Sequence, residues 1–250
     1  MITRTVTNGE VPLHVVDHGG DGQAIVLLHG GDRSSDDWTE IAGRLRALGH
    51  RPVAVDLRGH GRTPAAPWSW DLVLSDVTAV NEALGLVRPA VVGHSLGGMI
   101  AALWAADHPD CPLAVNLDGH GNPIHASQYA GLAPDQVTRA HTALRAELES
   151  MGAGLDDYLL TVVRAFEVLD RFGAYRRAQG PLVVTRSSRS MAGLLPEAVR
   201  DTWRAHERWL GEQLTALAAD GVLELVHTPT GHDVHLEEPA LVTDLVHDRL

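Results

Sequence analysis

A serine flanked by glycines stands between an apolar strand and an apolar helix, and no other feature constrains the fold of this chain as much. Residues 93–98 read Gly-His-Ser-Leu-Gly-Gly, after the apolar run 90–92 and before the small and apolar stretch 99–103. Glycines at both ends remove side chains where a sharp strand-to-helix turn has no room for a Cβ, so Ser95 is expected to adopt a strained backbone with its hydroxyl above the sheet. The alternative is an ordinary turn whose serine caps the helix.

Short apolar strands alternate with helical segments along most of the chain, which predicts an α/β protein. The helical segments carry apolar residues at helical spacing, as in Val73, Val77 and Val80. The pair Asn8-Gly9 predicts a tight hairpin between the first two strands. We therefore expect a mostly parallel, eight-stranded sheet with helices on both faces. Its strands are predicted over residues 3–7, 11–18, 25–28, 53–55, 87–92, 113–117, 182–185 and 223–227.

The alternation stops between residues 119 and 180, where the helical segments 134–151 and 155–175 follow each other without a strand between them. A segment inserted after the carboxyl end of a strand lies above the edge of the sheet where ligands bind in open α/β folds. We therefore predict a core made of residues 1–118 and 181–250, and a helical lid made of residues 119–180. A helical decoration remote from the site is the alternative.

Serine catalysis needs a general base, and the position of one histidine predicts which residue this is. A serine hydroxyl is too weak an acid to attack an acyl carbon unaided, and in a fold of this kind the expected chain order is serine, acid, histidine. His232 follows Gly231 in the loop after the last predicted strand, from which its imidazole can reach Ser95. His235 is the second candidate, and otherwise a packing or rim residue.

The acid is absent from its most frequent position. After the predicted strand 182–185 the chain reads Arg-Ser-Ser-Arg-Ser-Met, and no carboxylate occurs before Glu197. The preceding strand ends in Asp118, one strand nearer to the serine, from which a carboxylate can reach the same imidazole. We therefore predict Asp118 as the acid; its alternative role is to cap the start of the lid. Asp233, Glu197 and Asp201 are the other candidates.

An oxyanion hole requires two backbone N–H groups that point toward the developing negative charge. One is expected from Leu96, which follows the serine. The other is expected from Gly31, in the loop after the strand 25–28, where the missing side chain leaves space over the site. His29, in the same loop, is expected to hold the loop in place by hydrogen bonds.

The composition excludes several classes of partner. The formal net charge is −12, and the chain has no basic block that could replace the counterions of a nucleic acid. The N-terminal residues lack the apolar core of a signal peptide, and no apolar run approaches the length of a membrane span. We therefore expect a cytoplasmic protein that binds a small-molecule substrate, with neither nucleic acid nor membrane as a partner. A homodimer is left open.

No phosphate-binding loop and no metal-ligand spacing occur in the chain, so we expect neither a cofactor nor a metal. Asp118, His120 and His125 do lie close together in the sequence, but this is a weak signal for zinc.

Together, these segments resemble the α/β-hydrolase superfamily along essentially the whole chain. The matching segments are His29-Gly30-Gly31 with Trp38 after it, residues 56–61, residues 93–98 and Gly231-His232. The resemblance implies Ser95 as nucleophile, His232 as base, and Gly31 and Leu96 as oxyanion donors. The missing acid after the strand 182–185 is a departure from the pattern. Some members, including lactone-cleaving ones similar to the zearalenone hydrolases, carry the acid one strand earlier, as Asp118 would here.

The resemblance implies a serine hydrolase that cleaves a carboxylic ester or lactone of a hydrophobic small molecule through an acyl-enzyme. Trp68, Tyr129, Tyr158 and Phe166 are the candidate substrate-binding residues, although such residues also serve as the packing core of a lid. A lyase or cofactor-free oxygenase on the same scaffold is one alternative, and a non-catalytic ligand receptor is another.

Overall fold

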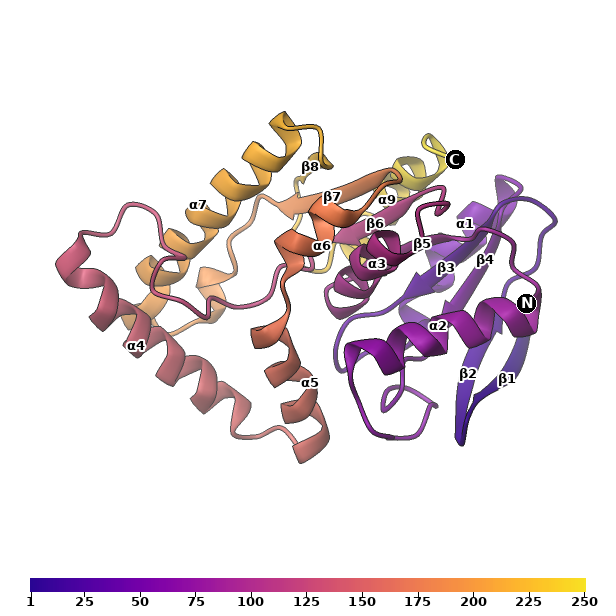
Figure 1. The fold of residues 1–250 in the computed structure, drawn as a ribbon, viewed down its shortest axis with the longest axis horizontal. Coiled ribbons are helices and arrows are strands. Elements are labelled where there is room, and N and C mark those ends of the chain that lie inside the picture. Colours follow the sequence, from indigo (N-terminus) through magenta and orange to yellow (C-terminus); the bar gives the residue numbers. More distant parts are fainter.

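An eight-stranded sheet runs through the computed structural model, which describes residues 1–250 (Figure 1). The strand order is β1-β2-β4-β3-β5-β6-β7-β8. β2 is antiparallel to β1 and β4, and all other pairs are parallel, which confirms the predicted mostly parallel α/β sheet. The strands are β1 (Ile2–Asn8), β2 (Val11–Asp17), β3 (Ala24–Leu28), β4 (Arg51–Val55), β5 (Ala90–His94), β6 (Ala114–Leu117), β7 (Leu182–Ser187) and β8 (Glu224–Thr228).

Helices cover both faces of the sheet and bury its central strands on both sides. In β3, Val26 and Leu28 belong to one core and Ile25 and Leu27 to the other, as the two-residue period of a strand requires. The first core also contains residues of α2 (Trp70–Leu84), α3 (Leu96–Asp107), α6 (Arg171–Arg177) and α7 (Glu197–Ala219). The second contains residues of α1 (Thr39–Ala47) and α9 (Pro239–His247). The remaining short elements are η1 (Ser35–Trp38), η2 (Met191–Leu194) and α8 (Val234–Glu237).

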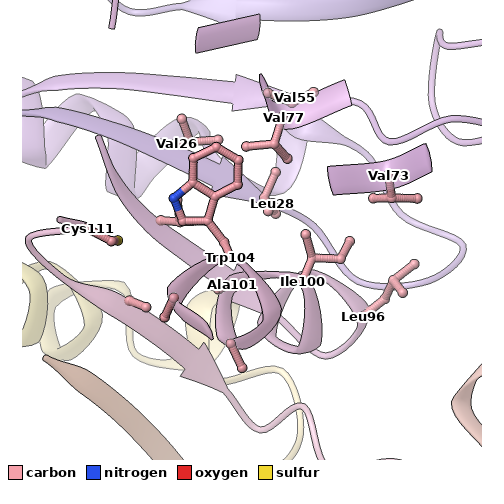
Figure 2. Close-up of a cluster of buried hydrophobic side chains, with 14 of the residues drawn as sticks. Val26, Leu28, Val55, Val73, Val77, Leu96, Ile100, Ala101, Trp104 and Cys111 are labelled. Carbon is pink, nitrogen blue, oxygen red and sulfur yellow. The ribbon is translucent and has the colours of Figure 1, made fainter. Parts of the chain in front are cut away.

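The helix that follows the serine turn is buried almost all round. Figure 2 shows Ile100, Ala101 and Trp104 of α3 among side chains from the central strands and from α2. Ile100 and Ala101 are fully buried, and Trp104 is 4% exposed. This packing fixes the start of α3 relative to the strand edge, and therefore the position of Ser95.

We expect Ile100→Ala to lower the free energy of unfolding by about 2–5 kcal/mol, because it leaves a cavity in a close-packed core. Urea denaturation measures this. Ile2→Ala is the matched control, since Ile2 is 56% exposed and its truncation should change the free energy of unfolding by less than about 0.5 kcal/mol. Equal losses in the two variants would contradict the packing described here.

Three helices lie between β6 and β7, where the predicted lid interrupts the alternation. They are α4 (Pro134–Gly152), α5 (Asp157–Val168) and α6 (Arg171–Arg177). The expected helix 155–175 is divided, because Asp170 caps a new helix by accepting a hydrogen bond from Gly173 N at 2.9 Å. None of the helices combines the length and the apolar content that a membrane span requires.

The helical layer beyond the sheet also includes residues after β7. α4 packs against α7 and lies beside it in Figure 1. A small core joins them, in which Leu144 of α4 meets Val199 and Trp203 of α7 and Ala192 of η2. α7 thus packs on α4 near its start, and further along it packs in the core on the sheet.

Candidate active site

Three neighbouring strands bring the candidate residues to one edge of the sheet. His94 of β5 pairs with Leu117 of β6, and Leu117 pairs with Thr185 of β7. Because these strands are parallel and in register, Ser95 and Asp118, which follow β5 and β6, leave the sheet side by side. This register is the physical reason why an acid after β6 can serve a site centred on the serine after β5.

The serine turn has the strained geometry predicted for it. Ser95 has φ 51° and ψ −111°, a conformation that costs a residue with a side chain about 1–3 kcal/mol. A Cβ at Gly93 would lie 2.0 Å from the Gly97 carbonyl carbon, and a Cβ at Gly97 would lie 2.1 Å from Leu28 O. The turn is therefore closed to side chains on both sides of Ser95.

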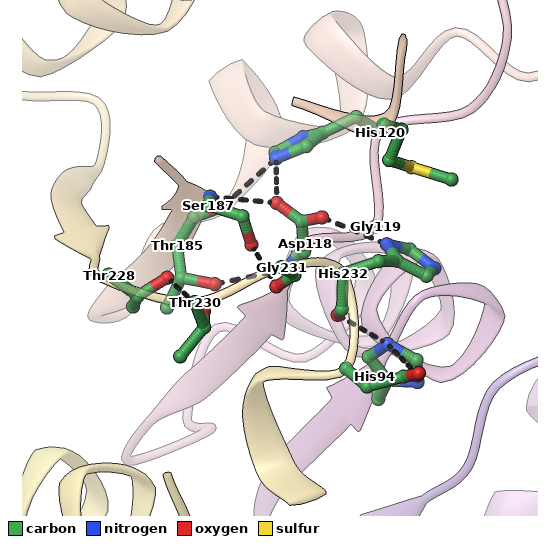
Figure 3. A network of polar contacts seen from close by, with 12 residues as sticks. His94, Asp118, Gly119, His120, Thr185, Ser187, Thr228, Thr230, Gly231 and His232 are labelled. Atoms are coloured by element: carbon green, nitrogen blue, oxygen red, sulfur yellow. Dashed lines mark hydrogen bonds and ion pairs between the residues drawn. The ribbon is translucent and has the colours of Figure 1, made fainter. Parts of the chain in front are cut away.

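The side chains of His232 and Asp118 are in contact at the border of the cavity. His232 Nδ1 lies 2.8 Å from Asp118 Oδ2, and Figure 3 shows the carboxylate between the rings of His120 and His232. Asp118 is 8% exposed and adopts φ 54°, a left-handed conformation that Asp tolerates better than most residues. With its Nδ1–H donated to Asp118, the His232 ring presents Nε2 as an acceptor.

Several groups hold the Asp118 carboxylate in its charged form. Its Oδ1 accepts a hydrogen bond from Ser187 N at 3.0 Å and lies 3.5 Å from His120 Nε2. Burial alone would raise the pKa of Asp118, but contacts with His120 and His232 outweigh burial and hold the pKa well below its ordinary value. The carboxylate is therefore ionised at neutral pH.

The loop that carries His232 is fixed by hydrogen bonds to its backbone. His94 Nε2 donates to His232 O at 2.9 Å, and Ser187 Oγ donates to Gly231 O at 2.6 Å. Burial and the neighbouring His235 lower the pKa of His94 well below its ordinary value, so His94 is a neutral donor.

The expected oxyanion loop lies against the start of α3. Gly97 N donates to His29 O at 3.1 Å, and a Cβ at Gly30 would lie 3.4 Å from Ser95 Cβ. A Cβ at Gly31 would meet no atom within 4 Å, so this residue borders open space. His29 holds the loop as expected, because its Nε2 accepts from Leu57 N at 2.9 Å and its Nδ1 donates to Gly30 O at 2.7 Å.

A cavity of about 210 Å³ opens over the serine turn. Ser95, Asp118 and His232 all border it. Five of its 18 lining residues are hydrophobic, and the rest are glycine, polar or charged. Besides the triad candidates, the wall consists of Met99, Gly121, Asn122 and His120; Phe166 of α5; residues 186–191; and Trp203, His206, Glu207 and Leu210 of α7.

Only Phe166, of the four candidate substrate-binding residues, lies in this wall. Tyr158 lies outside it, and its hydroxyl donates to Arg58 O at 2.6 Å. Trp68 packs beside Trp70 in the first core, and Tyr129 is in the small core between α4 and α7. Trp68, Tyr129 and Tyr158 therefore do not border this cavity, and in the structure they belong to packed clusters.

Two of the three other candidate acids have partners of their own. Asp233 Oδ1 lies 2.7 Å from Arg33 Nη2, and Asp201 Oδ1 lies 2.8 Å from Arg204 Nη1. Among the candidate carboxylates, it is Asp118 that contacts His232.

His235, the second candidate base, is 1% exposed and stacks on Trp38 and His94. Together with His94 and Asp233 it offers three metal-ligand atoms within 4.8 Å of one another. Arg33 already neutralises Asp233, and His94 Nε2 is donated to the His232 carbonyl. These groups therefore support the His232 loop.

Sequence reasoning missed most of the wall and the residues that hold the acid. Ser187 and Thr185 contact Asp118 through Ser187 N and Thr185 Oγ1, which accepts from Asp118 N at 3.1 Å. The carboxyl end of β7, which carries no acid, thus contributes one donor and one acceptor to the acid that follows β6. Trp203, His206 and Glu207 carry no local signal, since only the packing of α7 turns them toward the cavity.

Known proteins resemble this chain in sequence and in fold. A profile for the alpha/beta hydrolase fold matches residues 23–172. Lipase LipV of Mycobacterium tuberculosis is 31% identical over 269 residues, covering 96% of this chain and 98% of the lipase. A pimeloyl-(acyl-carrier protein) methyl ester esterase of Chromobacterium violaceum is 33% identical over 62% of this chain and 56% of the esterase.

Solved structures show the same architecture. A probable hydrolytic enzyme from Pseudomonas aeruginosa superposes with a TM-score of 0.72 at 19% identity, over 100% of this chain and 93% of that one. An enol-lactonase from Burkholderia xenovorans gives a TM-score of 0.67 at 19% identity, over 99% of both chains. The family profile spans more than half of the residues and the lipase aligns almost from end to end, so this chain belongs to the α/β-hydrolase family.

Proposed function

We propose that this protein is a serine hydrolase that cleaves a carboxylic ester or lactone of a small molecule through an acyl-enzyme. The observation that carries the proposal is the 2.8 Å contact between His232 Nδ1 and Asp118 Oδ2 at the cavity that Ser95 borders. Relatives named as a lipase and a methyl ester esterase support hydrolysis as the general chemistry.

In the proposed mechanism, Ser95 Oγ attacks the acyl carbon while His232 Nε2 takes the hydroxyl proton. Asp118 keeps Nδ1 protonated, so that Nε2 is free to accept, and stabilises the imidazolium that results. His232 then passes the proton to the leaving alcohol. In the second half of the reaction His232 takes a proton from a water molecule, which attacks the acyl-enzyme, and returns that proton to Ser95 Oγ as the acid is released. No hydrogen bond joins Ser95 Oγ to His232 in this structure, and we expect this contact to tighten when substrate binds.

The tetrahedral intermediate is stabilised, in this proposal, by the backbone N–H groups of Leu96 and Gly31. Leu96 is the first residue of α3, where N–H groups have no partner within the helix and the helix dipole favours negative charge. Gly31 borders open space and follows Gly30, where a Cβ would lie 3.4 Å from Ser95 Cβ. Two such donors would stabilise the negative charge that develops on the carbonyl oxygen.

The inserted helices cover the cavity as a lid in this proposal, together with the start of α7. Phe166 of α5 and Trp203 and Leu210 of α7 supply apolar surface. The polar remainder of the wall favours a substrate that carries a polar group as well as an apolar part.

A fluorophosphonate probe tests the nucleophile directly. An activated serine forms a stable phosphonyl adduct, so we expect stoichiometric labelling, with the adduct located on the peptide that contains Ser95. His232→Ala should slow labelling by at least about 100-fold, because the hydroxyl loses its base. Labelling of another residue, or equal labelling of the His232→Ala variant, would contradict the proposal.

A further inference from the structure

A buried arginine without a counterion lies behind the wall of the catalytic cavity. Arg171 is the first residue of α6, which packs against α3 (Figure 1), and it is 5% exposed. Its Nε and Nη2 atoms are fully buried and make no hydrogen bond, and no carboxylate forms an ion pair with it. Asp170, its neighbour, instead caps α6 through Gly173 N. The Phe172 ring, 5.3 Å from the guanidinium carbon, does not neutralise the charge.

Such an arrangement is unfavourable for stability. A buried cation loses its hydration, and an ion pair or several hydrogen bonds normally compensate. Burial lowers the pKa of Arg171, but a guanidinium stays protonated in proteins. A residue that lowers the stability of the free protein is expected at a functional site, where a bound ligand can supply the missing partner.

Gly121, which has no side chain, lies between this guanidinium and the cavity. A Cβ at Gly121 would lie 3.3 Å from Arg171 Nη1 and 3.5 Å from Met99 Cε, and both Gly121 and Met99 border the cavity. Met99 N donates to Ser95 O at 3.1 Å, so this part of the wall lies about one helical turn, roughly 5 Å, along α3 from the nucleophile.

The cavity has no free negative charge that would already serve Arg171. Asp118 is held by His120, His232 and Ser187 N. The other lining carboxylate, Glu207, accepts hydrogen bonds from Ser190 Oγ, Met191 N and Trp203 Nε1.

The neighbouring His206 adds no charge. Burial lowers the pKa of His206 to about 4, so this ring is neutral at pH 7. A substrate anion that reached Gly121 would therefore approach the guanidinium of Arg171, which has no ion-pair partner. Arg186, which borders the cavity and also makes no ion pair, donates to the backbone Glu207 O at 2.8 Å.

We propose that Arg171 forms an anion subsite next to the nucleophile and recognises a carboxylate on the acyl part of the substrate, so that the preferred substrates are hemiesters of short dicarboxylic acids. This inference rests on the proposed function and names a substrate class for it. In the reaction, Ser95 Oγ bonds to the ester carbon as the bond to the alcohol breaks, and the alcohol leaves with the serine proton. Water then releases the dicarboxylate and restores Ser95, with no change of oxidation state.

Two esters of equal shape test the subsite. Monoethyl glutarate carries the carboxylate, and ethyl 5-oxohexanoate replaces it with a neutral acetyl group; release of ethanol is measured for both. We expect wild type to favour the hemiester by about 10- to 100-fold in kcat/KM, the range of a charge-assisted contact. Arg171→Met should bring this ratio close to one, and Arg171→Lys should restore part of it. A wild-type enzyme without this preference would overturn the inference.

Two other arginines serve as comparisons. Arg177→Met removes the same charge from an exposed position of the same helix and should keep the ratio. Arg186 borders the cavity and donates to Glu207 O at 2.8 Å; Arg186→Met should also keep the ratio within about threefold. Loss of the preference in Arg186→Met with retention in Arg171→Met would overturn the assignment to Arg171.

Thermal unfolding separates a subsite from a structural role, and it does not depend on turnover. We expect glutarate to raise the Tm of wild type by a few degrees and to leave that of Arg171→Met unchanged. Without ligand, Arg171→Met should be at least as stable as wild type, because an unpaired buried charge is removed. A destabilised variant, or a wild-type Tm that glutarate does not shift, would contradict the subsite. If glutarate binds but no ester is cleaved, the proposed function fails and the subsite stands.

Discussion

Replacement of Ser95 by alanine should lower kcat/KM for ester hydrolysis by about 10⁵- to 10⁶-fold, the effect seen when a serine hydrolase loses its nucleophile. The reason is that no other group at the turn can form the acyl-enzyme. The backbone strain is the same for both residues, since each carries a Cβ at φ 51°. The Tm should therefore change little. Initial rates with p-nitrophenyl acetate and circular dichroism measure the two effects.

A serine far from the site is the control for Ser95→Ala. Ser150 is exposed near the end of α4, and Ser150→Ala should keep the wild-type rate. Retained turnover in purified Ser95→Ala, at more than about 1% of wild type, would exclude the acyl-enzyme mechanism.

Asp118→Asn should lower kcat by about 10⁴-fold with little change in stability. The amide has the shape of the carboxylate, and Asn tolerates the left-handed backbone at φ 54°. Its NH₂ group, however, would donate to His232 Nδ1 and force the ring proton onto Nε2, where the imidazole can no longer accept the serine proton. Initial rates of p-nitrophenyl acetate hydrolysis at neutral pH measure the loss.

Two of the other acids considered in the sequence analysis provide matched controls. Asp233→Asn removes a carboxylate from the residue next to His232, which pairs with Arg33, and should cost less than about threefold in kcat. Asp201→Asn, on α7, should behave in the same way. A larger loss in Asp233→Asn than in Asp118→Asn would move the role of the acid to residue 233.

Local patterns were sufficient where a structure is decided by neighbours in the chain. The glycines around Ser95 predicted a turn that excludes side chains, and the contacts that their missing Cβ atoms would make explain why. The strand-and-helix alternation predicted the parallel sheet, because its central strands are buried on both faces. The division of the helix 155–175 at Asp170 was missed, since one capping carboxylate competes with an otherwise continuous helical pattern.

The aromatic residues show where local patterns fail. Trp68, Tyr129 and Tyr158 have the composition of a pocket wall, yet they pack the inserted helices against their supports. An aromatic side chain stabilises any dry contact, so its type does not distinguish a lid core from a substrate pocket. The residues that do line the cavity from α7 are selected by how α7 packs on α4.

The sequence by itself determined the strand-turn-helix around Ser95, the α/β class and the positions of a candidate base and acid, because each depends on residues within one segment. Only the tertiary structure decided that Asp118, 114 residues before His232, meets its imidazole at 2.8 Å, and that Arg171 lies unpaired behind Gly121. Strand register and helix packing set these distances. They arise from the burial of many side chains at once, so no single segment encodes them.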